Sequence, residues 1–408
     1  MTNVDRQQSE TPAFDLAAVQ GVLREFGIHG WLLYDFRGNN PLACRLLGIA
    51  EDEVGTRRWF YVVPAEGQPH KLVHRIEDTA LDHLPGEKTI YLRWQELEAG
   101  VSTLVKGLST VAMEYSSRAG NPYVARVDAG TVELVKEQGV DVVSSGDLIQ
   151  RFEATWDDEQ WRMHQEVSVH TNSAFDLAWR TIADACRDGG SIEESAVRET
   201  IMAHFAAHNM TTYHPPIVAR GPNSGLPHYE TGEGDDTVIR QDEFVLIDLW
   251  AKFDRPRAVY SDLTRVGYVG ESVPDEYTKI FNIVAAARDA GIQTVRVAFA
   301  SGQPLTGAEV DDATRTVIEA TGYGEYFTHR TGHSIGQETH GNGANIDNLE
   351  TRDQRRILPG TCFSIEPGIY LPEFGIRSEV DVFVDFDGNV HVTGGEVQTE
   401  VLPILAKY

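Results

Sequence analysis

Residues 244–250 read FVLIDLW, an apolar run that one carboxylate, Asp248, interrupts. Residues 362–370, CFSIEPGIY, repeat the pattern around Glu366. Runs of this kind predict buried β-strands. Burying an ionised carboxylate costs several kcal/mol unless it is paired or binds a metal ion. One such acid would fit a salt bridge in the core, whereas two acids in matching positions indicate a functional site.

Two further acids stand where predicted strands begin. Asp262 precedes a strand predicted at 263–269 and follows Asp248 by 14 residues (262 − 248). Turn-forming residues lie between them, so we expect a hairpin that places the two carboxylates side by side. Glu379 likewise precedes a strand predicted at 380–384. A lone acid at a strand end is usually solvated. Asp262 and Glu379 therefore indicate a functional site only in combination with Asp248 and Glu366.

Histidines gather in the segment that lies between these acids. Residues 329–336 read HRTGHSIG, and His340 follows, so that three of the 14 histidines fall within twelve positions. Glycines on both sides of His333 predict tight backbone packing around a functional side chain. Imidazole combined with carboxylates suits first-row divalent ions, and an oxygen-rich site favours manganese. Four carboxylates offer a formal charge of −4, which two divalent ions would match.

The ordered set Asp248, Asp262, His333, Glu366 and Glu379 resembles that of the metallopeptidase family containing aminopeptidase P, prolidase and methionine aminopeptidase. The matching segments are IDLW, SDLTR, HRTGHSIG, FSIEPGIY and GIRSE. The resemblance implies an α+β class of fold: a pita-bread catalytic domain over residues 154–408, with a smaller α/β domain of the creatinase/prolidase type over 13–153. It also implies a site for two divalent ions, manganese first, with cobalt or zinc as alternatives.

The resemblance also implies the role of each metal ligand. Asp248 is expected to bind one ion, and His333 and Glu366 the other. Asp262 and Glu379 are expected to bridge the two ions. A water held between the ions would become the nucleophile. Glu366 is the expected acceptor of its proton.

Four further residues are expected to be catalytic by the same resemblance. His228, in GPNSGLPHY, and His340 correspond to histidines that stabilise the tetrahedral intermediate and the leaving group. Arg377, two residues before Glu379, corresponds to an arginine that orients the bridging acid. His329 has a counterpart in the Xaa-Pro enzymes.

Periodicity along the chain predicts two domains that meet near residue 153. The first third alternates a helix at 15–26 with strands at 31–34, 58–63, 89–92, 111–114 and 140–143, which predicts an α/β domain with a largely parallel sheet. The second part contains long helical patterns. They run over 156–186, from a Ser191/Glu194 capping box to about 208, from Pro274 onward, and from a Thr306/Glu309 capping box to Gly322.

Composition narrows the class of partner and the compartment. A net charge of −27 disfavours nucleic acid and anionic membranes as partners. No apolar stretch approaches the roughly 18 residues of a membrane span. The three cysteines, Cys44, Cys186 and Cys362, are sparse and widely spaced, and the polar start lacks the apolar core of a signal peptide. These features together favour the cytoplasm.

The expected activity is therefore hydrolysis of the Xaa-Pro bond in small peptides, by a dipeptidase or an aminopeptidase. The resemblance also implies that the enzyme is a homodimer. The Xaa-Pro nitrogen carries no N–H, so histidines and an apolar wall must recognise the ring instead. Trp250, Gly341 and Val380 depart from the family pattern near the pocket. They favour the alternative of a related enzyme for a non-peptide small molecule, such as an ectoine-derivative hydrolase or a sulfoniopropionate lyase. A non-catalytic binding module is disfavoured because all five ligands are present.

Overall fold

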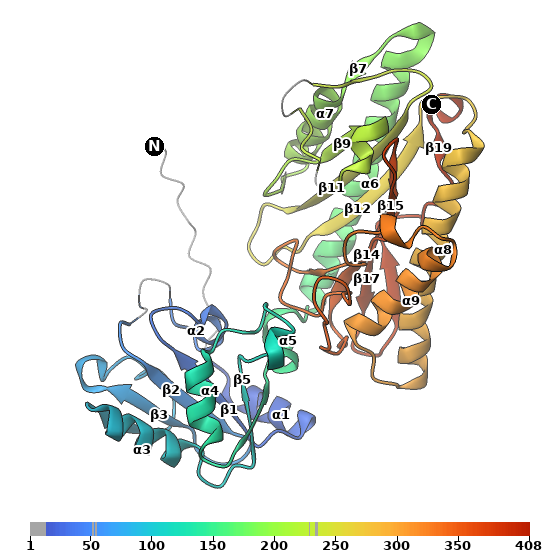
Figure 1. Cartoon of the computed structure of the whole chain (residues 1–408). Helices are drawn as coiled ribbons and strands as arrows, with labels where there is room; N and C mark the ends of the chain where they lie inside the picture. Colours follow the sequence, from blue (N-terminus) through green and yellow to red (C-terminus); the bar gives the residue numbers. More distant parts are fainter. Residues whose placement is uncertain (1–13, 51–52, 54, 228, 233–235) are drawn as a thin grey trace. The chain divides into compact units, whose positions relative to one another are not determined.

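The computed structural model of the chain describes residues 14–50, 53, 55–227, 229–232 and 236–408. The chain divides into two compact units (Figure 1). The first unit ends at Phe152, and the second runs from Glu153 to Tyr408. Among the described residues, no helix is both long and apolar enough to cross a membrane.

A mixed six-stranded sheet in the order β4-β3-β2-β1-β5-β6 forms the first unit. Side chains of strand β1 alternate between two cores, one on each face of the sheet. Trp31 and Leu33 pack on one face, and Leu32 and Tyr34 pack on the other. The strands are β1 (Gly30–Asp35), β2 (Trp59–Pro64), β3 (His70–His74), β4 (Glu87–Tyr91), β5 (Thr110–Met113) and β6 (Asp141–Ser144). The helices are α1 (Leu16–Phe26), α2 (Pro41–Leu46), α3 (Trp94–Leu104), α4 (Ala129–Lys136) and α5 (Gly146–Glu153).

The expectation of a largely parallel sheet is only partly right. Strand pairs β3–β4, β1–β5 and β5–β6 are parallel, but β1–β2 and β2–β3 are antiparallel. The sequence patterns did not predict β3, which follows β2 after only five residues, 65–69. A connection that short permits a hairpin but no parallel crossover.

The second unit is built around two sheets and a hairpin. One sheet has the order β19-β12-β11-β8, with β9 added beside β11, and the other has the order β13-β14-β17-β18. Their strands are β8 (Met210–Thr211), β9 (Ile217–Arg220), β11 (Phe244–Phe253), β12 (Ser261–Tyr268), β13 (Ser334–Ile335), β14 (Cys362–Ile365), β17 (Val380–Val384), β18 (Val390–Thr393) and β19 (Leu402–Pro403). The remaining strands pair as β15 (Gly368–Tyr370) with β16 (Gly375–Arg377), and β7 (Ile192–Glu193) with β10 (Val238–Ile239).

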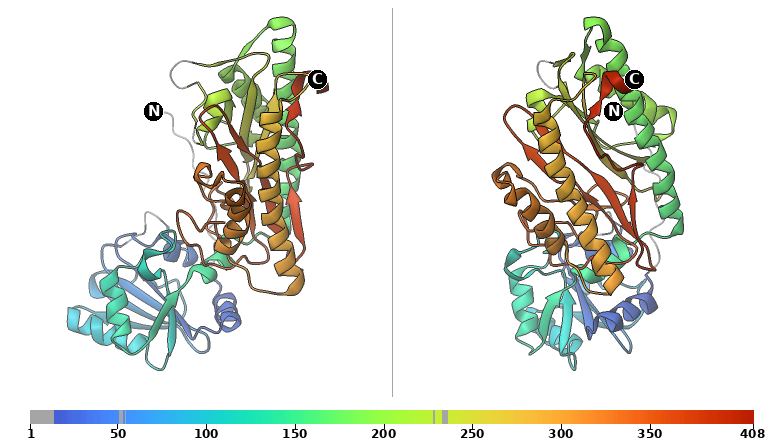
Figure 2. Two further views of the ribbon diagram at one scale, coloured as in Figure 1. Left: turned by 45° about the vertical axis from the view of Figure 1, so that its right-hand side comes forward. Right: turned by 90° about the vertical axis from the view of Figure 1, so that its right-hand side faces the viewer.

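Helices cover these strands on two sides (Figure 2). Odd-numbered residues of β11, such as Ile247 and Leu249, pack with α6 and α7, whereas Phe244 and Leu246 pack with α8. This division explains why β11 is apolar on both faces. The helices are α6 (Asp158–Cys186), α7 (Glu194–Ala207), α8 (Asp275–Ser301), α9 (Gly307–Ala320) and α10 (Ile404–Lys407).

Two local predictions in the second unit are wrong for identifiable reasons. The strand predicted at 362–370 is broken, because β14 ends at Ile365 and β15 begins at Gly368, so that Glu366 lies in the break. The predicted Ser191/Glu194 capping box does not form. Glu194 is instead buried, and its carboxylate accepts hydrogen bonds from the Arg220 backbone and the Tyr229 hydroxyl. By contrast, the Thr306/Glu309 capping box is confirmed.

A buried histidine, His164, should make the stability of the second unit depend on pH. His164 donates from Nδ1 to the Tyr260 carbonyl and accepts at Nε2 from the Thr393 hydroxyl, which holds the ring neutral. Burial lowers the pKa of His164 to about 4. Between pH 6.5 and 4 the unfolded chain therefore binds a proton that the folded chain does not, so stability that is present above pH 6.5 is lost as the pH falls.

His164→Gln should lack this dependence. Relative to the variant, the metal-free wild type should lose about 3 kcal/mol of unfolding free energy between pH 7 and pH 4. Urea denaturation at several pH values measures the difference. A gap between the two proteins that stays constant with pH would contradict the prediction.

Candidate metal centre

Asp248 and Asp262 lie on the same face of one antiparallel strand pair. Asp248 is opposite Thr264, and Trp250 is opposite Asp262, so the two acids are diagonal neighbours. Side chains two residues apart on a strand share a face, and diagonal positions across a pair lie within reach of each other. The hairpin expected from the spacing thus brings both carboxylates together. Both acids are buried, with 8% of Asp248 and 4% of Asp262 exposed.

His333 presents a lone pair to two acids. Its Nδ1 lies 3.2 Å from the Ser334 carbonyl, which can only accept, so Nδ1 carries the proton. Nε2 is then unprotonated, and it lies 3.5 Å from Asp262 Oδ2 and 3.4 Å from Glu366 Oε1. Burial holds the pKa of His333 well below its usual range. A lone pair that faces two carboxylate oxygens is the arrangement that a bound cation would stabilise.

Gly332 allows this close approach. A Cβ at Gly332 would lie 2.0 Å from the Ser364 carbonyl oxygen, which no side chain tolerates. The backbone of His333 then donates to the Ser364 hydroxyl at 3.0 Å, and that hydroxyl donates to Glu366 Oε1 at 3.0 Å. The expected tight packing beside His333 is therefore present at Gly332.

Asp262, His333 and Glu379 form the compact centre of the site. One ligand atom from each lies within 4.8 Å of the others. Glu379 occupies the link between β16 and β17, and it accepts a hydrogen bond from the Thr264 hydroxyl at 2.7 Å. Glu366 borders this group through His333, and Asp248 borders it through the charge that it exerts on Asp262. The donors that meet here could hold metal ions.

Mutual repulsion among these acids indicates that the site suits a cation. Burial raises the pKa of Asp262 and of Glu379 well above the usual range, and the neighbouring carboxylates raise both further. Burial also raises the pKa of Glu366 to about 7, with Arg377 opposing the shift. Carboxylates gathered at this density need positive charge beyond one guanidinium. Imidazole and carboxylate donors suit first-row divalent ions, so the residues present fit such a metal.

Arg377 connects Asp248 with Glu379, two of the predicted ligands. Its Nη2 contacts Asp248 Oδ2, Nε donates to Thr264 Oγ1 at 3.0 Å, and Nη1 donates to the Tyr370 hydroxyl at 3.0 Å. Thr264 in turn donates to Glu379. The Arg377 guanidinium therefore holds Asp248 directly and Glu379 through Thr264. The expected contact of Arg377 with an acid of the site is present, but it is direct to Asp248 and passes through Thr264 to Glu379.

His329 reaches the site through a tyrosine. Its Nδ1 lies 2.6 Å from the Arg330 carbonyl and therefore donates, so Nε2 accepts from the Tyr370 hydroxyl at 2.6 Å. Burial raises the pKa of Tyr370 to about 12 and keeps that hydroxyl protonated. His329 is thus connected to Arg377 through the Tyr370 hydroxyl.

His340 and His228 are the two other histidines predicted to be catalytic. The ring of His340 packs edge-on against that of His333, with 4.3 Å between their centroids, and its side chain is exposed. His340 is therefore accessible to a small substrate at the edge of the centre. His228 lies outside the described residues.

Sequence patterns did not single out three polar residues that contact the proposed ligands or Arg377. Thr264 and Tyr370 lie within the quoted segments SDLTR and FSIEPGIY, but nothing in their spacing marks them. Asp381 accepts from the Asp262 backbone at 3.1 Å, and burial raises the pKa of Asp381 to about 8. Alternation would have found it, since Asp381 interrupts the apolar strand β17 as Asp248 interrupts β11.

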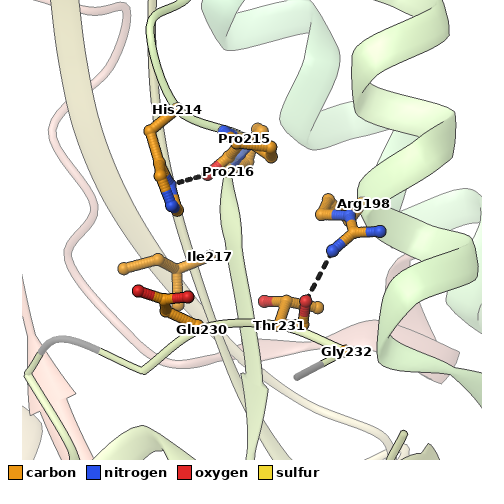
Figure 3. Close-up of a pocket in the computed structure, with 8 residues that line it drawn as sticks. All are labelled: Arg198, His214, Pro215, Pro216, Ile217, Glu230, Thr231 and Gly232. Carbon is orange, nitrogen blue, oxygen red and sulfur yellow. Dashed lines mark hydrogen bonds between the residues drawn. The ribbon is translucent and has the colours of Figure 1, made fainter. Parts of the chain in front are cut away.

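The second unit also contains a separate small pocket (Figure 3). Its volume is about 160 Å³. His214 lines it and stacks on Trp250, with 6.2 Å between ring centroids. None of the predicted site residues that the structure describes lines this pocket, so we assign the pocket no part in the chemistry. The lining residues are Arg198, His214, Pro215, Pro216, Ile217, Glu230, Thr231 and Gly232.

The chain matches a known protein family over more than half of its length. The model of metallopeptidase family M24 matches residues 166–385, more than half of the chain. The chain belongs to this family. The match includes the five predicted ligand positions, from Asp248 to Glu379.

Individual relatives and solved structures agree with this assignment. The uncharacterized peptidase YqhT of Bacillus subtilis is 30% identical over 256 residues, which are 62% of this chain and 67% of that protein. The Xaa-Pro dipeptidase of Lactobacillus delbrueckii subsp. lactis is 32% identical over 232 residues, 56% of this chain and 58% of that protein. The crystal structure of dipeptidase PepE from Mycobacterium ulcerans matches with a TM-score of 0.59 at 22% identity, covering 95% of this chain and 96% of that one.

These comparisons confirm the predicted family and the α+β pita-bread class of fold. The chain is a metallopeptidase of family M24, and membership implies that it uses divalent metal.

Proposed function

We propose that Asp248, Asp262, His333, Glu366 and Glu379 hold two divalent ions, manganese by preference, and that the enzyme hydrolyses the Xaa-Pro bond of small peptides. The observation that carries the proposal is the buried group of Asp262, His333 and Glu379, whose ligand atoms lie within 4.8 Å of one another. The unprotonated Nε2 of His333 faces two acids there. Two ions balance four carboxylates, whereas one ion would leave a buried net charge.

The bound ions would supply a polarised scissile carbonyl and a water of lowered pKa. The chain's own residues would do the rest. Glu366 is the most exposed of the four acids, so it is the one able to exchange a proton with a water beside the substrate. His340 lies exposed beside His333, where it can donate a hydrogen bond to the substrate as charge develops on the carbonyl oxygen.

An aromatic wall supports the preference for proline. The Tyr213 ring packs near those of Trp250 and Tyr260, with 6.0 and 6.5 Å between centroids. Tyr213 is largely exposed, and partial desolvation, followed by the charges of Asp262 and Asp248, raises the pKa of its hydroxyl. A flat apolar surface can accept the pyrrolidine ring, and the missing N–H of an Xaa-Pro bond leaves no donor there to satisfy.

Metal counting combined with a substrate panel tests the proposal. We expect two manganese ions per chain after reconstitution, with turnover of Ala-Pro and Leu-Pro but little of Ala-Ala. Binding of two ions without cleavage of Xaa-Pro bonds would overturn the proposed substrate class and favour the non-peptide alternative. A chain that binds no stoichiometric metal would overturn the site as well.

His340→Ala should separate catalysis from metal binding. Loss of a donor to the developing charge is expected to lower kcat by about 10²- to 10³-fold. Metal content should stay at the wild-type level, because His340 packs on His333 without joining the compact group. Steady-state kinetics together with metal analysis of the same sample provide the check, and loss of metal would show that His340 is a ligand.

A cytoplasmic location is also our proposal, and it rests on the cysteines. Cys44, Cys186 and Cys362 are all free and buried. Free thiols without a disulfide partner suit a reducing compartment. The homodimer implied by the family likeness stays a prediction.

A further inference from the structure

A second cluster of potential ligands lies away from the centre described above. One ring nitrogen from each of His170, His204 and His208 lies within 4.8 Å of the others. His170 belongs to α6, His204 to α7, and His208 follows the end of α7. The three rings pack closely, with 4.4 Å between the centroids of His170 and His208 and 4.2 Å between those of His204 and His208.

The sequence and the packing of two helices create this cluster. His204 lies in the last turn of α7, and His208 is its C-cap residue four positions later, so the two side chains meet at the end of the helix. α7 packs against α6, which supplies His170 from the neighbouring helix (Figure 1). All three histidines are partly exposed, so an ion has access from solvent.

Backbone carbonyls set the protonation of two of these rings. Nε2 of His204 lies 3.1 Å from the His170 carbonyl, and Nδ1 of His208 lies 2.8 Å from the His204 carbonyl. A carbonyl only accepts, so each of these nitrogens carries the proton. A neutral ring then keeps its lone pair on the other nitrogen, Nδ1 of His204 and Nε2 of His208. Metal-binding histidines are commonly fixed in this way by a backbone carbonyl.

The local charges also favour a cation over a proton. Burial lowers the pKa of His170 and His204, and neighbouring histidines lower both further. Glu166, one turn before His170 on α6, opposes the shift at His170 and adds negative charge beside the cluster. Crowded imidazoles that disfavour one another's protonation can instead share one cation through their ring lone pairs.

We propose that His170, His204 and His208 bind one divalent first-row transition ion, with zinc as the probe, at a site separate from the catalytic centre. Three histidines with an open fourth position form a common zinc donor set. The ion would link α6 to the end of α7, where the chain continues into β8. Because β8 pairs with the end of β11, the strand of Asp248, the link would stabilise the second unit without contributing to hydrolysis.

The test counts zinc in three matched proteins: wild type, His208→Gln and His29→Gln. His29 is in the first unit, outside the cluster, and its replacement controls for the loss of any histidine. We expect His208→Gln to bind one zinc fewer per chain than the other two proteins. Its manganese-supported peptide hydrolysis should be unchanged. At zinc about 100-fold above its dissociation constant, the Tm of wild type should rise by at least about 4 °C more than that of His208→Gln.

A second measurement uses the wild-type chain alone, in case the variant folds poorly. Diethyl pyrocarbonate acylates unprotonated ring nitrogens, so bound zinc should protect His170, His204 and His208 while His29 continues to react. Peptide mass spectrometry identifies each site. Equal zinc content in all three proteins, or reaction of the cluster that zinc leaves unaltered, would overturn the proposal. Neither outcome depends on whether the enzyme cleaves Xaa-Pro bonds.

Discussion

Replacing Glu379 with glutamine is expected to lower the rate of peptide hydrolysis by at least about 10³-fold, a larger effect than the 10- to 100-fold typical of residues that only support a metal ligand. Glu379 shares the compact group with Asp262 and His333. Its amide replacement keeps the volume and can still accept from Thr264, but it loses the charge that would hold a cation in the proposed site. Metal content should therefore fall together with activity.

The same change should have the opposite effect on the metal-free chain. Burial and the charges of Asp262, Glu366 and Asp248 raise the pKa of Glu379, so its ionised form destabilises the fold when no cation is bound. Without metal, Glu379→Gln should unfold at a Tm equal to or above that of wild type. With manganese added, only wild type should gain stability.

Glu373→Gln is the matched control for both measurements. Glu373 is exposed in the loop between β15 and β16, a few residues before Glu379, and its replacement makes the same change in charge. It should leave activity, metal content and Tm unaltered. Full activity in Glu379→Gln, or a metal content equal to that of Glu373→Gln, would remove Glu379 from the site.

Arg377→Met is the second change for which we expect a large effect. Arg377 is 4% exposed and contacts Asp248, Thr264 and Tyr370. Methionine keeps the apolar stem but leaves Asp248 without its guanidinium partner, which should destabilise the metal-free chain by about 3 kcal/mol. Loss of the support that Arg377 gives to Asp248 and Glu379 should weaken metal affinity about 10- to 100-fold.

A second substitution at Arg377 separates the effect of its charge from the effect of its contact geometry. Arg377→Lys keeps the positive charge but cannot contact three partners at once, so it should recover stability more fully than activity. Arg352→Met, at an exposed position, controls for the loss of an arginine. Metal titration and urea denaturation measure the two effects. Wild-type metal affinity in Arg377→Met would show that the guanidinium does not organise the ligands.

Short-range patterns predicted much of the fold. Apolar runs located β11 and β17, the Thr306/Glu309 pair located the start of α9, and the 14-residue spacing predicted the hairpin of Asp248 and Asp262. These features depend on residues close in the chain, where side-chain direction repeats with the period of a strand or helix. The order of the five proposed ligands pointed to the family, which the comparisons confirm.

Local patterns failed where a distant partner outweighed a local preference. Glu194 belongs to an apparent capping box, yet its carboxylate is satisfied by Arg220 and Tyr229 from another segment. Glu366 stands inside an apolar run, yet the strand breaks there, because Pro367 has no N–H to extend the ladder. The mixed sheet of the first unit likewise depended on β3, a short strand without a strong pattern.

By itself, the sequence determined most of the long helices and apolar strands, and it singled out the acids and histidines that interrupt or precede those strands. Only the tertiary structure decided how those residues act on one another. Thr264 and Glu379 are 115 positions apart in the chain, and Arg377 and Asp248 are 129 apart. His170 meets His204 and His208 only because α6 and α7 pack together. Periodicity records the direction of a side chain within its own segment, whereas the partner it meets depends on how distant segments pack.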